Sequence, residues 1–282
     1  MPAYGWLKDK PDRRDLLFRR LYAPVEIAEY VDLTKYCGPT LNQLRSGTCV
    51  GHGVAAIKNW YENYQKDYPT GGLSPQCIFM LATAIEGRLG EEGAYPRDAF
   101  QGLLNWGTVT TPECPYTEDR SRDYDPRKKF TTTQAAPWGI QSYVRFEKVD
   151  EFLQQLNAGF PVNAGIPWYT NQEEPDSQGY YPEGNGELAG GHDVPFFGYD
   201  LKKGYVLLQQ SWGEEATPLK GFAWYPLHDL RIDEKDSDFH GLVDKVPINP
   251  NPPIPPTPTK MCKKLLAIDK DYQTLLKSLG CK

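Results

Sequence analysis

Several features that would fix a protein class at once are missing from this sequence. No stretch reaches the roughly 18 to 20 apolar residues that a membrane span needs, and residues 1–8 lack the basic-then-apolar layout of a signal peptide. The chain has six cysteines in 282 residues, too few and too scattered for a disulfide scaffold, and none has the C-x-x-C spacing of zinc and redox sites. We therefore expect a cytoplasmic protein without a metal site or a cofactor.

The composition is that of a folded globular protein, with 39% hydrophobic and 24% charged residues. Gly (26) and Pro (25) are both abundant, which favours loops over long helices and argues against a helical bundle. The formal net charge of −6 argues against a nucleic-acid partner.

The C-terminal part differs from the rest of the chain. Residues 247–258 contain seven prolines in twelve positions, which predicts a stiff spacer rather than a helix or a strand. Beyond it, apolar residues recur at spacings of three and four, typical of an amphipathic helix, with six Lys against two Asp. This helix either packs on the body, docks a partner or lies across the cleft as an inhibitor. We predict a main domain, a linker and a helix, at residues 1–246, 247–259 and 260–282.

Within the main domain, helical signals precede strand signals. Apolar residues lie on one stripe of a helix from about residue 50 to 64, and Ser74 and Pro75 predict the start of a second helix that runs to about Glu86. Residues 194–199 and 205–210 are short apolar runs joined by a polar, Gly-containing connection, typical of a hairpin. The fold class is therefore α+β, with two lobes that meet at a cleft.

Cys49 is the candidate nucleophile. It stands at the start of the first predicted helix, where backbone N–H groups and the helix dipole stabilise a thiolate. A general base must face it from the other lobe, and His192, at the mouth of the first hairpin strand, suits this role. His52 lies on the same helix as Cys49 and points along it, so it is the weaker candidate.

The hairpin register supplies two further residues. With the turn near residue 202, His192 falls opposite about Trp212, so the amide of Gln210 can orient the imidazole and Trp212 can shield that bond from water. Gln43 precedes Cys49 by six residues across a Gly-containing turn. Its side-chain amide is therefore a candidate for an oxyanion hole together with the Cys49 backbone N–H.

These residues lie in segments that resemble the papain-like cysteine peptidases, particularly bacterial and phage-type members. Five segments match that family in order and in spacing over roughly residues 5–235: NQLRSGTCV at 42–50, LSPQ at 73–76, GEEGAYP at 90–96, GHDV at 191–194 and QSWG at 210–213.

The resemblance implies a papain-like fold with a helical left lobe and an antiparallel, β-barrel-like right lobe. It also implies a peptidase that cleaves peptide or protein substrates through a thioacyl intermediate on Cys49, with His192 as acid and base. Gly93 and Ala94 would pair with an extended substrate, and the bare Gly191 would leave the second subsite open to a bulky apolar residue.

Three departures from the family pattern bear on activity. Gln210 stands where the family has Asn, and its extra methylene displaces the amide by roughly 1.3 to 1.5 Å. Catalytic geometry does not tolerate displacements of this size, so we expect reduced activity. Ser46 replaces a cysteine that forms a disulfide in many secreted members, which favours reduced thiols. The opening residues resemble the start of a mature domain, so we expect no inhibitory propeptide. An impaired peptide-binding adaptor and an acyl or peptidyl transferase remain alternatives to the peptidase.

Overall fold

The computed structural model describes residues 4–13, 15–20, 25–232 and 235–244. The predicted Pro-rich linker and the predicted C-terminal helix both lie outside the described residues. The account below therefore concerns the main domain.

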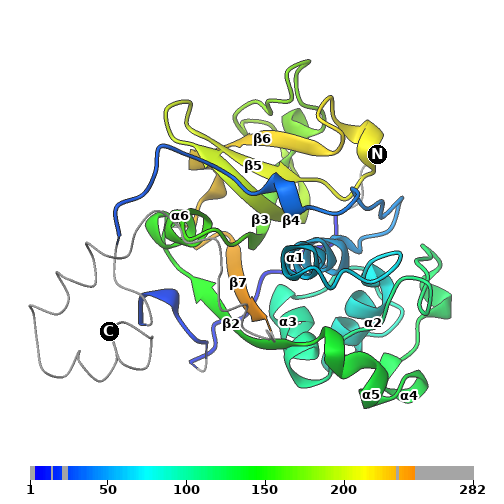
Figure 1. Cartoon of the computed structure of the whole chain (residues 1–282). Coiled ribbons are helices and arrows are strands. Elements are labelled where there is room, and N and C mark those ends of the chain that lie inside the picture. Colours follow the sequence, from blue (N-terminus) through cyan, green and yellow to red (C-terminus); the bar gives the residue numbers. More distant parts are fainter. Residues whose placement is uncertain (1–3, 14, 21–24, 233–234, 245–282) are drawn as a thin grey trace, which may run out of the picture. The chain divides into compact units, whose positions relative to one another are not determined.

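The helical lobe is built around α1 (Cys49–Gln65), α2 (Pro75–Glu86) and α3 (Pro96–Asn105), which pack side by side (Figure 1). Both predicted helices are confirmed, and α1 begins at Cys49. In α2, the Ser74 side chain accepts a hydrogen bond from the Cys77 backbone N–H, Pro75 is the first helical residue, and Gly87 ends the helix with a left-handed conformation. Two single-turn helices, α4 (Pro126–Lys129) and α5 (Thr132–Ala135), cover the outer side of this lobe.

The second lobe is an antiparallel sheet. The described residues form seven strands: β1 (Tyr30–Asp32), β2 (Ile140–Phe146), β3 (Val162–Tyr169), β4 (Leu188–Asp200), β5 (Tyr205–Gln209), β6 (Phe222–Pro226) and β7 (Asp238–Asp244). Their order is β2-β7-β3-β4-β5-β6, with β1 paired to β4, and α6 (Val149–Asn157) packs against β2, β3 and β4. The path is open between β2 and β6, so the expected antiparallel sheet is present but is not a closed barrel.

The predicted hairpin is β4 and β5, and its register contains one irregularity. Asp200 pairs with Tyr205 and Tyr199 with Val206, but the pairing shifts by one residue between Phe196 and Gly198. This shift brings the residues beyond the end of β5 into line with His192, as the hairpin arithmetic requires.

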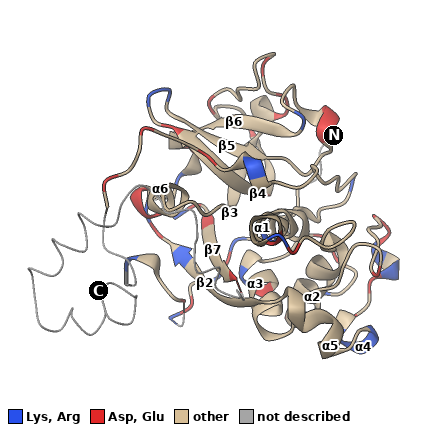
Figure 2. Ribbon diagram, viewed as in Figure 1, with Lys and Arg blue, Asp and Glu red and all other residues tan. Residues whose placement is uncertain are grey.

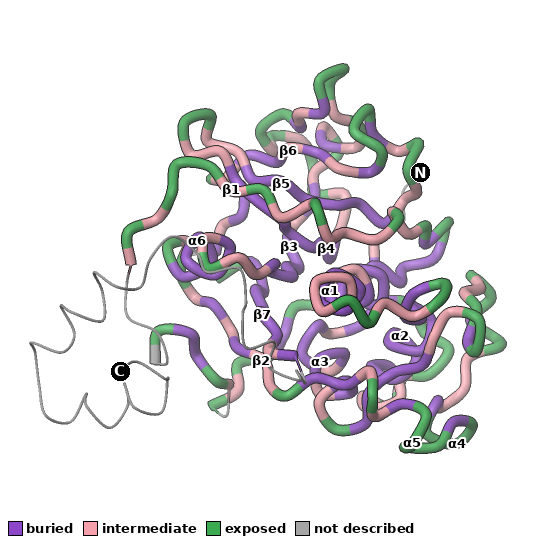
Figure 3. Tube along the Cα trace, viewed as in Figure 1, coloured by how far each residue is buried: buried purple, intermediate pink, exposed green. Residues whose placement is uncertain are grey.

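Each lobe has its own large apolar core. One fills the sheet lobe around Trp168, Phe196 and Tyr225, and the other lies between α1, α2 and α3 around Trp60 and Phe100. Figure 3 shows the central strands and α1 as mostly buried, with exposed residues on the loops, and Figure 2 shows charged residues mainly outside the central strands. Among the described residues, no helix has the length and apolar character to cross a bilayer.

Candidate active site

Cys49 is the first residue of α1 and is completely buried. Thr48 is the N-cap residue, and its side chain makes no capping hydrogen bond. The first backbone N–H groups of α1, next to the Cys49 thiol, are therefore not capped by this side chain. The helix packs against β4, the strand that carries His192. The structure therefore brings the two predicted reactive residues to the junction of the lobes.

The imidazole of His192 is enclosed by aromatic rings. Trp212 stacks on it, with centroids 4.6 Å apart and planes 12° from parallel, and Trp168 and Tyr4 meet it edge-on at 5.1 Å and 6.0 Å. These rings exclude water from His192, which is fully buried. The expected shielding role of Trp212 agrees with this geometry.

Gln210 holds one nitrogen of this imidazole. Its Oε1 lies 2.9 Å from His192 Nε2, and its own Nε2 donates a hydrogen bond of 2.9 Å to the hydroxyl of Tyr181. With its oxygen toward the imidazole, the Gln210 amide accepts a hydrogen bond from His192 Nε2, so this nitrogen carries the proton of the neutral ring. His192 Nδ1 has no hydrogen-bond partner among the described residues and keeps a lone pair for a proton from a thiol.

Gln43 is buried and rigidly oriented. Its Nε2 donates to the Ser46 carbonyl at 2.8 Å, its Oε1 accepts the Ser211 hydroxyl, and its backbone N–H donates to the Ser211 carbonyl at 2.8 Å. The amide nitrogen thus faces the turn that leads into Cys49, the orientation an oxyanion donor requires.

Residues 4–9, here called the N-terminal strap, run between the two lobes through this site. The N–H groups of Gly5 and Trp6 donate to the Gly191 carbonyl at 3.1 and 2.9 Å. On the other side, Ala94 donates to the Gly5 carbonyl at 2.9 Å and accepts from Leu7 at 3.0 Å.

The strap therefore occupies backbone groups of Gly191 and Ala94, two residues predicted to contact substrate. Of the two predicted pairing residues, Ala94 bonds the strap, whereas the Gly93 N–H donates to the Gly47 carbonyl.

Burial sets the protonation of the reactive pair. Burial raises the pKa of Cys49 to about 12, and an ionised Asp193 would act in the same direction, against the opposing backbone N–H groups of Asp193, Gly5 and Val50. Burial also lowers the pKa of His192 to about 4. With the strap in place, thiol and imidazole are both neutral, and the thiolate expected at the helix start is suppressed by desolvation.

Asp193 is a second buried group beside the nucleophile. Its Oδ2 accepts a hydrogen bond of 2.8 Å from Asn163 Nδ2, while its Oδ1 and the Oδ1 of Asn163 lack partners among the described residues. Both oxygens face Gly53 on α1, where an added Cβ would lie 2.4 and 2.8 Å from them. A proton on Asp193 Oδ1 would satisfy both oxygens in a cyclic acid–amide pair, which agrees with the strong upward shift of the Asp193 pKa caused by burial.

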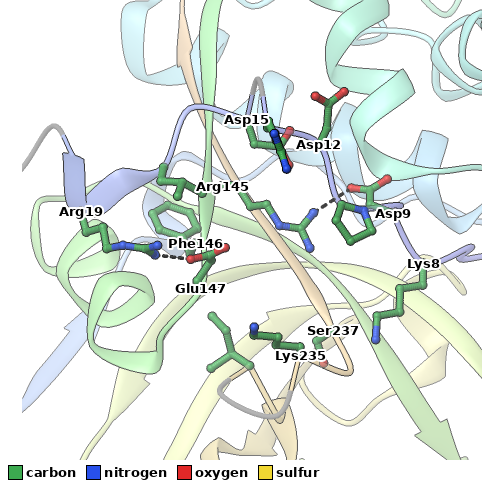
Figure 4. A pocket seen from close by; sticks show the side chains of 14 residues that line it. Lys8, Asp9, Asp12, Asp15, Arg19, Arg145, Phe146, Glu147, Lys235 and Ser237 are labelled. Carbon is green, nitrogen blue, oxygen red and sulfur yellow. Dashed lines mark hydrogen bonds and ion pairs between the residues drawn. The ribbon is translucent and has the colours of Figure 1, made fainter.

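The strap is anchored at its far end by a buried polar cluster. Asp238 accepts from the Asp9 backbone N–H at 2.7 Å, and Arg145 bridges the carboxyl groups of Asp9 and Asp238 at 3.3 and 2.6 Å. Figure 4 shows Arg145 reaching Asp9 across a hollow of about 470 Å³ that residues 8–19 help to line. Acidic and basic groups alternate around this hollow, so it favours neither sign of ligand.

The comparisons with known proteins agree with this geometry. The family model described as papain family cysteine protease matches residues 27–226. The chain belongs to the papain family. An uncharacterized peptidase C1-like protein, L477, of Acanthamoeba polyphaga mimivirus is 22% identical over 84% of this chain and 85% of its own.

Two solved structures place the papain-family fold on this chain. Xylellain, a cysteine protease from Xylella fastidiosa, superposes with a TM-score of 0.75 at 24% identity, covering 86% of this chain and 97% of its own. Bromelain from Ananas comosus, in complex with E64, gives a TM-score of 0.59 at 17% identity over 78% of this chain and 100% of its own.

Four described residues of this papain-family site went unpredicted as parts of it. Tyr181 and Trp168 lie in stretches rich in aromatic residues, a composition that suits a core as well as a cleft. Asp193 carried a usable signal, a carboxylate beside a histidine at the start of an apolar strand. Trp6 lies in a short segment without any periodic pattern, so its position depends entirely on distant partners.

Proposed function

We propose that this chain is a thiol-dependent peptidase in which Cys49 is the nucleophile and His192 the acid and base. The observation that carries the proposal is how Gln210 holds His192: its Oε1 lies 2.9 Å from Nε2, and Nδ1 has no partner among the described residues. A neutral imidazole with a basic nitrogen at the junction with α1 is what proton transfer from a thiol needs.

In the proposed reaction the Cys49 thiol gives its proton to His192 Nδ1, and the sulfur attacks the peptide carbonyl carbon. The resulting oxyanion accepts hydrogen bonds from the Gln43 amide and the Cys49 backbone N–H. The C–N bond then breaks as the imidazolium protonates the leaving amine. Water, deprotonated by His192, attacks the thioester and releases the acid and the thiol.

The conformation described here is a latent one. The strap covers Cys49, and the Gly5 carbonyl is turned to the Ala94 N–H while the Gly5 N–H faces the sulfur. The nucleophile therefore meets an amide donor in place of a carbonyl carbon, so in this conformation the strap blocks the site and offers Cys49 no bond to cleave. Substrate binding requires the strap to leave.

The test uses the full chain and the epoxide E64, the inhibitor present in the bromelain structure. We expect a single covalent adduct on Cys49 by mass spectrometry, formed faster in Trp6→Ala, which weakens the strap, than in the wild type. Cys49→Ala should give no adduct, and Leu16→Ala, at a half-exposed position outside the strap, should react like the wild type. Equal labelling of all cysteines in Trp6→Ala would refute an activated Cys49.

The two alternatives differ in their products. An adaptor that only binds peptide would form no E64 adduct and would hydrolyse no peptide, even with the strap displaced. A transferase would give mainly amide-exchange product when a peptide substrate is supplied with an excess of a second amine. Analysis of the product mixture by mass spectrometry separates these outcomes from hydrolysis.

A further inference from the structure

Two buried cysteines of the helical lobe lie together outside the candidate active site. Cys77 is the third residue of α2, and Cys114 lies in the loop that follows α3. Both are free thiols, and both belong to a small apolar cluster that also contains Met80 and Trp106. They are far apart in the sequence, so the fold alone brings them to one place.

The Ser74 hydroxyl joins the backbones of the two cysteines. It accepts a hydrogen bond of 2.9 Å from the Cys77 N–H and donates one of 2.6 Å to the Cys114 carbonyl. A disulfide requires two backbones this close, because the Cα atoms that it joins lie about 4.4 to 6.8 Å apart. The side chains also meet, since the two thiols interact as hydrogen-bond partners.

A chain of polar groups leads from the surface to Cys114. The exposed Lys129, the last residue of α4, donates a hydrogen bond of 3.1 Å to the Tyr124 hydroxyl, and that hydroxyl lies 3.5 Å from Cys114 Sγ. Because the Tyr124 oxygen accepts from Lys129, its own proton can point at the sulfur. Hydrogen bonding from Cys77, followed by that from Tyr124, lowers the pKa of Cys114 against the effect of burial, and the charge of Lys129 acts in the same direction.

Cys77 is held as the neutral partner of this pair. Its contact with Cys114, followed by burial, raises the pKa of Cys77 well above its ordinary value, although the Thr108 side chain opposes the shift. One thiol therefore ionises readily while its neighbour keeps a proton. This is the division of roles between the attacking and the resolving cysteine of a peroxide-sensitive pair.

We propose that Cys114 and Cys77 form a reversible disulfide when the protein meets hydrogen peroxide. The oxidant has to be small, because Cys114 is only 2% exposed. The site does not involve Cys49, so this proposal and the peptidase proposal stand or fall separately.

The reaction has two steps. The Cys114 thiolate attacks one oxygen of the peroxide, the O–O bond breaks, and the leaving hydroxide takes up a proton as water, which leaves a sulfenic acid on Cys114. The sulfur of Cys77 then displaces hydroxide from this sulfenic acid, and the hydroxide takes the Cys77 proton and leaves as a second water. Peroxide is thereby reduced by two electrons, and the two thiols are oxidised to the disulfide.

The experiment treats the folded full chain carrying Cys49→Ala with hydrogen peroxide at neutral pH, blocks the remaining thiols with iodoacetamide and digests the protein with trypsin. Cleavage after Lys and Arg gives peptides 67–88 and 98–120, each with a single cysteine. We expect these peptides as a linked pair that is lighter by two hydrogen atoms than the two reduced peptides together. Dithiothreitol should separate them.

Variants in the same background test the roles of the two thiols and of the polar chain. Cys77→Ala should stop the reaction at the sulfenic acid, which dimedone traps on peptide 98–120. Lys129→Gln removes the cation at the end of the chain and should slow formation of the linked pair about threefold or more, and Tyr124→Phe should slow it about tenfold. Lys128→Gln, at the neighbouring exposed lysine, is the matched control and should react at the unchanged rate.

Absence of the linked pair from the folded protein would overturn the proposal, as would a linked pair that forms only after unfolding in urea. Equal rates in Lys129→Gln, Tyr124→Phe and Lys128→Gln would also contradict it, because the reactivity of Cys114 would then not depend on the polar chain.

Discussion

Gln210 reaches His192 across one methylene more than the family's Asn provides, and its amide oxygen still lies 2.9 Å from the imidazole Nε2. The Tyr181 hydroxyl takes the other end of the amide at 2.9 Å, so the longer side chain is held between two fixed partners. The displacement expected from the extra methylene is absorbed by this arrangement. Gln at this position therefore does not by itself imply an impaired site.

The first prediction concerns Gln210→Asn, which restores the residue that the family has at this position. In the Trp6→Ala background, Gln210→Asn shortens the side chain by roughly 1.5 Å, so it no longer spans both His192 and Tyr181. We expect kcat/KM on a fluorogenic peptide to fall about tenfold or more, with the loss mainly in kcat, because the residue orients the base. Tyr181→Phe, which keeps the ring and removes the anchor, should cause a smaller loss. Full activity in Gln210→Asn would show that the orientation of the imidazole is set elsewhere.

Local signals account for the parts of this fold that the sequence predicted. Ser74 and Pro75 predicted the start of α2 by capping chemistry alone, and the hairpin arithmetic placed His192 opposite about Trp212, next to Gln210. In each case the partners lie within about twenty residues of one another along the chain. Such features can be predicted because short sequence patterns determine the local backbone geometry.

The features that were missed depend on contacts between distant residues. Gly5 forms backbone hydrogen bonds with Ala94 and Gly191. Because every residue carries these backbone groups, no pattern of side chains in the sequence predicts the pairing. The Tyr181 hydroxyl reaches Gln210 because the loop before β4 pairs with β6, where the Tyr181 N–H donates to the Trp224 carbonyl at 2.9 Å. The raised pKa of Cys49 likewise follows from its complete burial, which the helix-start argument does not include.

The second prediction concerns Gly5, where the strap passes closest to the helical lobe. A Cβ at this position would lie 1.8 Å from the backbone oxygen of Gly47, an atom that cannot yield as a flexible side chain can. Gly5→Ala should therefore expel the strap and raise both peptidase activity and the rate of E64 labelling at least tenfold. Leu7→Ala, which removes a side chain from the same strap without adding a clash, is the matched comparison and should have a smaller effect. Unchanged labelling of Gly5→Ala would argue against latency.

The third prediction is that latency weakens as the pH rises. Burial, followed by the charge of Asp238, raises the pKa of Asp9 to about 8 in the docked strap, although Arg97 and Arg145 lower it, and His240 also faces the carboxyl. A released Asp9 titrates near 4. Docking therefore favours the protonated acid, and its affinity falls as the pH rises from about 4 to about 8.

The measurement is the ratio of E64 labelling rates in Trp6→Ala and in the wild type, taken from pH 5 to pH 8. We expect the ratio to decrease with pH, because the wild-type strap opens increasingly by itself. Asp9→Asn cannot ionise and should stay latent across the range. Parallel pH profiles of the labelling rate for the wild type and Asp9→Asn would show that ionisation of Asp9 does not control docking of the strap.

The last prediction concerns the acid–amide pair of Asp193 and Asn163. Burial raises the pKa of Asp193 well above its ordinary value, with the charges of Asp9 and Asp238 adding to the shift and the Asn163 hydrogen bond opposing it. On the α1 side, the ionisable group is Cys49, whose pKa an ionised Asp193 raises. In the unfolded chain Asp193 ionises near pH 4, whereas in the folded chain it keeps its proton. Its contribution therefore makes the folded state lose stability as the pH rises above about 4.

Asp193→Asn tests this sign, because an asparagine amide can form the same cyclic pair with Asn163 without a titratable proton. We expect the variant to match the wild type in thermal unfolding at pH 4 and to be progressively more stable than it toward pH 8. Asp119→Asn is the opposite control, since hydrogen bonds from Ser121 lower the pKa of that exposed carboxylate. Removing it should not make the protein more stable toward pH 8. Melting curves of the wild type and Asp193→Asn that stay parallel from pH 4 to pH 8 would mean that Asp193 is ionised in the fold.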